Sequence, residues 1–126
     1  PGREIQVAIL ENKVLGAIEL RPTRKFYDYQ AKYNPKARTE HIIPVEISKR
    51  KYQELTKIAL KAHKILNCRG VTRSDFRYYK NSFYLLETNT QPGMTSLSLV
   101  PEIANFNNIT FKNLIKKILK DASINK

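Results

Sequence analysis

The apolar residues of this chain recur at two different spacings, and the spacing changes along the sequence. In residues 5–11 (IQVAILE) and 14–20 (VLGAIEL), apolar and β-branched side chains dominate, and Asn12-Lys13 separates the two runs. Residues 70–79 (GVTRSDFRYY) and 83–89 (FYLLETN) form a second pair of the same kind around a three-residue turn, Lys80-Asn81-Ser82. Runs of this length and composition, separated by turn residues, predict two β-hairpins.

Two longer segments have the three-to-four-residue spacing of amphipathic helices. Ser48 is the expected N-cap of a helix that runs to Leu66, and Asn67 suits the left-handed position after its end. Thr110 is the expected N-cap of the last helix. His63 is expected at the boundary of the first helix's apolar face. The apolar positions that set the helical spacing are Tyr52, Leu55, Ile58, Ala59, Ala62, Ile65 and Leu66, then Phe111, Leu114, Ile115, Ile118 and Leu119.

The segments between these elements have weaker patterns. Residues 40–45 (EHIIPV) allow a further strand, and a short helix is expected to begin at Ser98 or Pro101. Residues 21–39 contain two prolines and four aromatic residues without a regular period. This predicts a long loop, and long loops are often functional. Because strands outnumber helices, we expect an α+β fold with a mostly antiparallel sheet flanked by helices.

Length and composition narrow the class of protein. A chain of 126 residues is long enough for one domain with one core. It has no apolar run of about 18 residues, so no membrane span is expected. The N-terminal stretch PGREIQVAILENK does not have the pattern of a signal peptide. The single Cys68 excludes an internal disulfide and suits a reducing compartment.

The net charge of +12 raises the question of a nucleic-acid partner. The basic residues, however, follow the outer faces of the two predicted helices, where solvated lysines are common. The sequence has no RNP-like, zinc-finger or helix-turn-helix pattern. We therefore expect neither a nucleic-acid nor a membrane partner, and salt-dependent RNA binding would reopen the question.

Four polar residues gather on the second predicted hairpin. If this hairpin is centred on Asn81, Asp75 lies opposite Glu87, and Arg73 lies opposite Asn89 on the same face. Facing carboxylates repel unless a cation neutralises them, and oxygen ligands without His or Cys favour Mg²⁺ or Mn²⁺. Such an ion usually completes its shell with water and phosphate oxygens, which implies a phosphate-bearing substrate, most often a nucleotide. The spacing equally fits charges that pair with one another, such as Arg73 with Asp75 or Glu87.

The strand of residues 83–89 leads into the turn TQPGMTSLS. Its apolar run predicts a buried strand that holds the tip of the hairpin rigidly. Gly93 lets the backbone approach a ligand closely, and its N–H is suited to bind developing negative charge. A plain surface turn is the alternative for a Pro-Gly pair.

Taken together, these residues resemble the D-alanine–D-alanine ligase family of ATP-grasp enzymes, which act in bacterial cell-wall synthesis. The segments that carry the resemblance are GRE before the first strand, FYDYQAKY, RSDFR, LLETNTQPGMTSLSLVP and ITFKNLIKKIL. They extend over nearly the whole chain. The resemblance implies that residues 1–126 form the C-terminal part of an ATP-grasp domain. It also implies that the N-terminal domain and the first ATP-grasp subdomain of the family lie outside this chain.

The resemblance assigns substrate contacts to four residues. Glu4 matches a carboxylate that holds the ATP ribose, and Lys32 matches a loop lysine that reaches the γ-phosphate. Tyr33 matches a tyrosine that closes the loop over the site. Ser98 matches a serine that binds the carboxylate of the second D-alanine, a role compatible with that of a helix N-cap.

The resemblance also assigns the metal and the oxyanion site. Asp75, Glu87 and Asn89 match the ligands of two Mg²⁺ (or Mn²⁺) ions, with Glu87 bridging them. Arg73 and the backbone N–H of Gly93 match the groups that stabilise the tetrahedral oxyanion. Neither histidine matches a catalytic position.

The resemblance implies ATP-dependent joining of two D-alanine molecules through an acyl phosphate in the bacterial cytoplasm, and it allows a homodimer of the full-length enzyme. This chain alone is expected to be inactive. Ligases that join D-alanine to D-lactate or D-serine, and other ATP-grasp carboxylate–amine ligases, are the alternatives within the class. A non-catalytic binding module that retains the fold is the alternative outside it.

Overall fold

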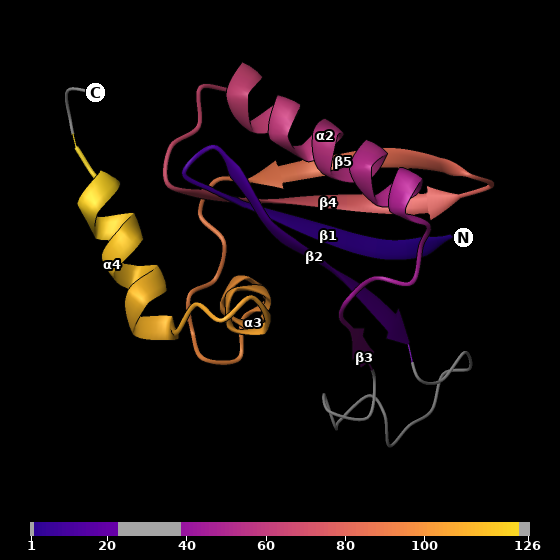
Figure 1. Ribbon diagram of the computed structural model, residues 1–126. Helices are drawn as coiled ribbons and strands as arrows, with labels where there is room; N and C mark the ends of the chain where they lie inside the picture. The colour runs from indigo at the N-terminus through magenta and orange to yellow at the C-terminus, as the bar shows by residue number, and fades with distance from the viewer. Residues whose placement is uncertain (1, 23–38, 124–126) are drawn as a thin grey trace.

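The computed structural model describes residues 2–22 and 39–123 (Figure 1). The predicted loop falls mostly outside this part, and Lys32 and Tyr33 lie outside it too. The described elements are β1 (Arg3–Leu10), β2 (Lys13–Pro22), β3 (Thr39–Ile42), α2 (Lys49–Ile65), β4 (Val71–Tyr79), β5 (Ser82–Asn89), α3 (Leu99–Phe106) and α4 (Phe111–Asp121).

The strands form a five-stranded sheet in the order β3-β2-β1-β4-β5, and every neighbouring pair is antiparallel. Helix α2 covers one face of the sheet, whereas α3 packs against β2 on the other face, beside α4 (Figure 1). The predicted α+β class with an antiparallel sheet flanked by helices is confirmed.

The two hairpins have the same construction. Each turns on two consecutive residues with positive φ, which are Glu11 and Asn12 (53° and 62°) in the first and Lys80 and Asn81 (48° and 64°) in the second. Two-residue turns of this kind match the twist of antiparallel strands. The first turn lies one residue earlier than the predicted Asn12-Lys13, and the second is two residues long instead of the predicted three. Both hairpins then accommodate one extra residue in the second strand as a β-bulge.

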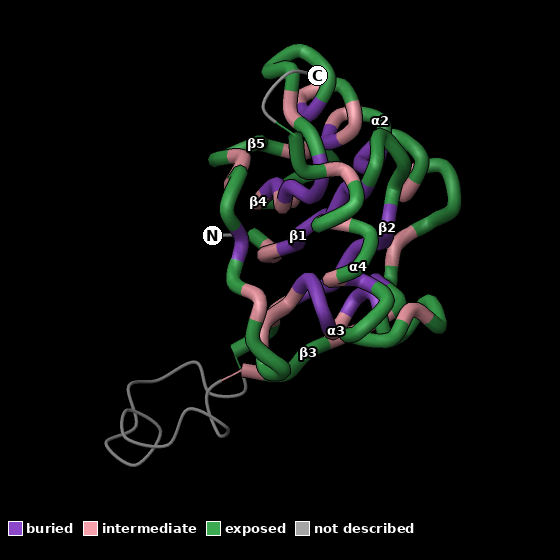
Figure 2. The backbone as a smooth tube through the Cα atoms, turned by 90° about the vertical axis from the view of Figure 1, so that its left-hand side faces the viewer, coloured by how far each residue is buried: buried purple, intermediate pink, exposed green. Residues whose placement is uncertain are grey.

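The sheet buries apolar side chains on both faces, so β1, at its centre, is largely buried (Figure 2). Two clusters make up the core. The cluster beneath α2 consists of Ile5, Val7, Ile9, Ala17, Val45, Leu55, Ala59 and Phe76. The cluster beneath α3 and α4 consists of Ala8, Leu10, Leu15, Ile18, Val71, Val100, Ile103, Ala104 and Leu114.

The helix termini agree with the sequence. The Ser48 and Thr110 side chains accept hydrogen bonds from the backbone N–H groups of Lys51 and Asn113, at 3.1 and 3.2 Å. Asn67 has the expected left-handed conformation, with φ of 55°.

The apolar faces of the helices differ in part from the prediction. Ile65 and Leu66 are 67% and 58% exposed, because α2 extends past the edge of the core it covers. In α4 only Leu114 is fully buried, and Leu119 is 67% exposed. His63 was expected at a boundary, but it is completely buried and its Nδ1 lies 2.7 Å from the Thr72 hydroxyl. This bond to β4 satisfies one ring nitrogen, whereas Nε2 is buried without a hydrogen-bond partner among the described residues.

The prediction of a buried strand at residues 83–89 is wrong. β5 is the last strand of the described sheet, and Tyr84, Leu85 and Leu86 are between 42% and 60% exposed. A strand with a neighbour on one side only cannot be enclosed as β1 is. The tip of this hairpin is held by its pairing with β4 instead.

Candidate functional site

A row of polar side chains crosses the β4–β5 side of the sheet on the face that α3 covers elsewhere. In the register, Asp75 lies opposite Glu87 and Arg73 lies opposite Asn89, as the sequence predicted. On its other side Asp75 is paired with Gln6 of β1. Because Gln6 precedes Ala8 of the α3-facing cluster by two positions, the row shares that cluster's face.

The predicted register is correct at the site for a reason that the sequence analysis did not contain. Near the turn Phe76 pairs with Leu85, and the next pair is Asp75 with Glu87, which leaves Leu86 as the bulged residue. Regular pairing after the two-residue turn would place Leu86 opposite Asp75, and Glu87 would then lie on the opposite face. The bulge therefore brings the two carboxylates together.

Arg73 and Asp75 form an ion pair along β4. Arg73 Nε and Nη2 donate to the two carboxylate oxygens of Asp75 at 2.9 and 3.2 Å, and both side chains are largely shielded from solvent. One of the two interpretations left open by the sequence, pairing of Arg73 with Asp75, is thus present in the ligand-free chain. Glu87 makes no hydrogen bond or ion pair within residues 2–22 and 39–123, and it is exposed.

The donor set fits a hard divalent cation. Within the described part of the chain no three His, Cys, Asp or Glu side chains gather, so the site is two facing carboxylates with the Asn89 carboxamide. All three donors are oxygens, as Mg²⁺ and Mn²⁺ prefer, and each carboxylate keeps free lone pairs. Glu87 brings an unpaired negative charge directly opposite Asp75, an arrangement that a cation stabilises. Asn89 Oδ1 accepts from Gln91 N–H at 2.8 Å, which fixes the side chain at the start of the turn.

The turn after β5 is packed tightly around Gly93. A Cβ atom at this position would lie 2.9 Å from Ser98 Oγ, so the turn admits no larger residue without displacing that hydroxyl. Ser98 is the N-cap residue of α3, as predicted, but its hydroxyl makes no capping bond. It accepts from Thr95 N–H at 3.0 Å and lies 2.8 Å from the Thr95 hydroxyl. The first turn of α3 therefore has no side-chain cap, and the N–H groups of Leu99 and Val100 make no hydrogen bond among the described residues, which leaves these two available for an anion; Pro101 has no N–H.

Glu4 lies on the same face, two residues before Gln6 and opposite Arg77 of β4. One of its carboxylate oxygens accepts from Gln6 Nε2 at 3.2 Å, and the other lies 3.7 Å from Arg77 Nη2. The sequence analysis did not single out Gln6 or Arg77. Gln6 and Arg77 are each two positions from a predicted site residue on the same strand. That they lie beside Glu4 and Asp75 on one face becomes clear only when the pairing of β1 with β4 is known.

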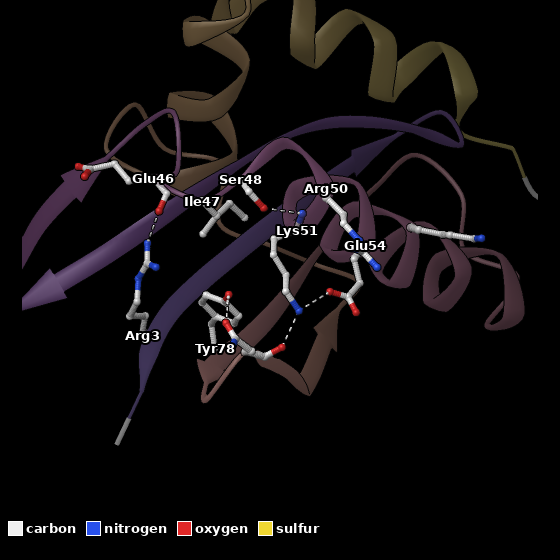
Figure 3. A pocket seen from close by; sticks show the side chains of 10 residues that line it. Arg3, Glu46, Ile47, Ser48, Arg50, Lys51, Glu54 and Tyr78 are labelled. Carbon is white, nitrogen blue, oxygen red and sulfur yellow. Dashed lines mark hydrogen bonds and ion pairs between the residues drawn. The ribbon is translucent and has the colours of Figure 1, made fainter.

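A cavity of about 860 Å³ lies beside α2, away from this row (Figure 3). Two of its four basic residues, Arg3 and Lys51, are already engaged by protein groups. Arg3 donates to both Glu19 oxygens at 2.9 and 2.7 Å, and this hydrogen bonding lowers the pKa of Glu19 although burial opposes it. Lys51 donates to Glu54 and to the Asn81 carbonyl oxygen at 3.0 and 2.6 Å. Because half of its basic residues are paired internally, this cavity is a weaker candidate than the carboxylate row.

The predicted site residues are thus distributed in three groups. Asp75, Glu87, Asn89 and Arg73 are brought together by the β4–β5 pairing, and Gly93 and Ser98 meet in the following turn. Glu4 lies on the same face, further along the sheet. Lys32 and Tyr33 lie outside the described residues. Among the described helices none is long and apolar enough to cross a membrane.

Comparisons with known proteins place this geometry in a family. A family model described as "D-ala D-ala ligase C-terminus" matches residues 1–120. A D-alanine–D-alanine ligase from Pelagibacter ubique (strain HTCC1062) is 66% identical over 126 residues, which are 100% of this chain and 41% of that protein. Another, from Wolbachia pipientis subsp. Culex pipiens, is 48% identical over 125 residues, 97% of this chain and 39% of that protein. The chain spans about two fifths of the length of these curated relatives.

The same likeness is found among solved structures. The crystal structure of the D-alanine–D-alanine ligase from Bacillus anthracis complexed with ATP superposes with a TM-score of 0.81 at 32% sequence identity. The match covers 96% of this chain and 39% of that one.

Proposed function

This chain belongs to the family of D-alanine–D-alanine ligase C-terminal domains, and we propose that it supplies the metal, nucleotide and oxyanion groups of such a ligase. The observation that carries the proposal is the pairing of Asp75 with Glu87, with Asn89 two residues further, on one face of the sheet. The reaction is the ATP-dependent joining of two D-alanine molecules, in the cytoplasm. The N-terminal domain and the first ATP-grasp subdomain would complete the cleft.

In this proposal Asp75, Glu87 and Asn89 hold Mg²⁺ or Mn²⁺, which lowers the cost of the charge that accumulates on phosphate oxygens. The first D-alanine's carboxylate attacks the γ-phosphorus of ATP, ADP leaves, and an acyl phosphate forms. The second D-alanine's amine then attacks the acyl carbon, and phosphate leaves after the nitrogen has lost its proton.

The protein groups of the proposal serve the second step in particular. The tetrahedral intermediate carries negative charge on oxygen, which suits the guanidinium of Arg73 and the N–H of Gly93. Arg73 is bonded to Asp75 and is therefore held at a fixed distance from the metal ligands. Ser98, at the N-terminus of α3, would bind the second substrate's carboxylate, with the free N–H groups of the helix beside it. Glu4 would hold the ribose. The roles of Lys32 at the γ-phosphate and of Tyr33 in closing the site remain predictions.

The test is a chimera. The matching region of the Pelagibacter ubique relative is replaced by residues 1–126 of this chain, since 66% identity over that region preserves most contacts with the rest. We expect the chimera to form D-alanyl-D-alanine in the presence of ATP and Mg²⁺, and D-lactate and D-serine offered as second substrates to react more slowly.

The unmodified relative is the positive control, and circular dichroism verifies that the chimera folds. A folded chimera that hydrolyses ATP or binds it but forms no dipeptide would contradict the proposal. The 126 residues alone are expected to form no dipeptide, because correct positioning of the two reactants supplies roughly 7–11 kcal/mol of barrier reduction and needs both walls of the cleft.

A further inference from the structure

Gln6 is a buried amide within the row of charged side chains. On β1 it lies two residues after Glu4, and its partners across the sheet are Asp75 on β4 and Ile18 on β2. Its exposed fraction is only 5%. An amide buried to this extent needs a hydrogen-bond partner at each end of its side chain.

Only one end of this amide has such a partner. Gln6 Nε2 donates to Glu4 Oε2 at 3.2 Å, whereas Gln6 Oε1 is buried without a hydrogen-bond partner among the described residues. A buried acceptor without a donor lowers stability, and an apolar side chain of similar shape would not carry that cost. Stability of the sheet therefore does not explain a glutamine at this position. Positions that violate a folding rule in this way are often functional.

The bond that Gln6 does make restrains Glu4. The second oxygen of Glu4 lies 3.7 Å from Arg77 Nη2, so the two oxygens are engaged from two different strands. The Arg77 contact is long, its two side chains are 44% and 35% exposed, and such ion pairs contribute little. The hydrogen bond from the buried amide is the stronger restraint, because its donor cannot move into solvent.

We infer that Gln6 is a positioning residue that holds the Glu4 carboxylate in the orientation that accepts the hydroxyl groups of the nucleotide's sugar. Gln6 does not touch the nucleotide and acts only through Glu4. The inference rests on the proposed function, in which Glu4 binds the ribose of ATP. A carboxylate already fixed in its binding orientation loses less conformational entropy when the ligand arrives.

The experiment compares Gln6→Met with Gln53→Met. Methionine keeps the length of the side chain and removes both amide groups, and Gln53 is an exposed glutamine on α2, on the other face of the sheet. Equilibrium dissociation constants for ATP and for 2′,3′-dideoxy-ATP are measured by calorimetry on the chimera with Mg²⁺. The melting temperature is measured on the 126-residue chain, and KM values for ATP and D-alanine on the chimera.

For Gln6→Met we expect an approximately tenfold weaker affinity for ATP, the low end of what a hydrogen bond to a charged group contributes. Affinity for dideoxy-ATP should not change, because that ligand has no sugar hydroxyl for Glu4 to accept from. The KM for D-alanine and kcat should stay within about twofold, and the melting temperature should stay constant or rise. Gln53→Met should change none of these values.

Unchanged affinity for ATP in Gln6→Met would overturn the inference. So would an equal loss for ATP and dideoxy-ATP accompanied by a lower melting temperature, since that is what a merely structural residue would give. Gln6→Leu serves as a second variant, and failure of both variants to fold would also contradict the inference. Binding of ATP without dipeptide formation would refute the proposed function but leave the role of Gln6 intact, whereas a chimera that binds no ATP would refute both.

Discussion

The two hairpins of this chain are built alike and are used differently. Both have a two-residue left-handed turn followed by one bulged residue in the second strand, Leu15 in β2 and Leu86 in β5. Leu15 is 9% exposed and belongs to the cluster beneath α3, whereas Leu86 is 60% exposed. The same backbone device thus completes the core in one hairpin and orients a polar row in the other.

The difference follows from the position of each hairpin in the sheet. Among the described strands, β1 and β2 have neighbours on both sides, whereas β5 has a neighbour on one side only. A strand at the edge contributes less to the core, so its sequence can meet the requirements of a ligand. The same kind of change should therefore lower the folding stability of the chain when it is made in the first hairpin. It should lower the rate of dipeptide formation by the chimera when it is made in the second.

The largest effect is expected from inserting one alanine directly after each bulged residue. After Leu86, the insertion moves Glu87 and Asn89 by one position and hence to the other face of the sheet. Dipeptide formation by the chimera should fall by at least about 10³-fold, since both a metal ligand and the start of the oxyanion turn are displaced. After Leu15, the same insertion turns Ile18 out of the core, and the chain should fail to fold.

Dipeptide assays on the chimera and circular dichroism of both insertion variants measure these outcomes. An insertion after Leu86 that unfolds the 126-residue chain as thoroughly as the one after Leu15 would remove the distinction between the hairpins.

Much of this architecture could be predicted because it depends on local residues. Ser48 and Thr110 were identified as N-caps because their side chains can accept hydrogen bonds from the first turn of a helix. Asn67 was identified as the residue after the end of α2 because asparagine tolerates the left-handed conformation. The pairing of Asp75 with Glu87 was predicted correctly, but from a three-residue turn without a bulge, two errors that cancel in the register. Nothing in the letters LL marks one leucine as bulged.

The features that sequence reasoning missed depend on neighbours that are distant along the chain. The exposure of β5 depends on which strand is last in the sheet. The burial of His63 depends on a hydroxyl nine residues away, on β4. Gln6 becomes conspicuous only when the register places it beside Asp75 and leaves its oxygen without a donor. The roles of Lys32 and Tyr33 came from the family resemblance and stay predictions.

The second prediction exchanges Glu for Gln in each hairpin. Glu87→Gln keeps the shape of the side chain and removes a metal-binding charge, so turnover of the chimera should fall about 10²–10³-fold, while stability stays constant or increases as the repulsion of Asp75 disappears. Glu19→Gln breaks the buried end of the ion pair with Arg3 and should destabilise the chain. Turnover and urea unfolding measure the two effects, and normal turnover of Glu87→Gln would rule out the metal assignment.

The third prediction replaces one glycine by alanine in the first hairpin and another in the turn that follows the second hairpin. Each replacement adds one methyl group. In Gly16→Ala the new Cβ would lie 2.7 Å from Ile103 Cγ2, and overpacking of this kind costs about 1–3 kcal/mol of stability. In Gly93→Ala it would lie 2.9 Å from Ser98 Oγ, so turnover should fall about 10–10²-fold with little loss of stability. Turnover of the chimera and the melting temperature measure both changes. Unchanged turnover in Gly93→Ala, or a stability loss as large as that of Gly16→Ala, would contradict the prediction.

The smallest effect concerns the place where the two hairpins join, at Thr72 of β4 opposite Ile9 of β1. Burial lowers the pKa of His63 below 6.5, and Lys64 adds to the shift. The unfolded chain therefore binds a proton near pH 6.5 that the folded chain does not yet bind, so stability is complete above this pH and declines as the pH falls towards the folded-state pKa. We expect the unfolding free energy of the 126-residue chain to decrease as the pH falls from 7.5 to 5.5. His63→Gln, neutral throughout, should be less stable at pH 7.5 but should not show this loss. His41→Gln, which changes a partly exposed histidine, should retain it. Urea unfolding of the three proteins at both pH values decides the matter, because an equal decline in His63→Gln would assign the pH dependence to another group.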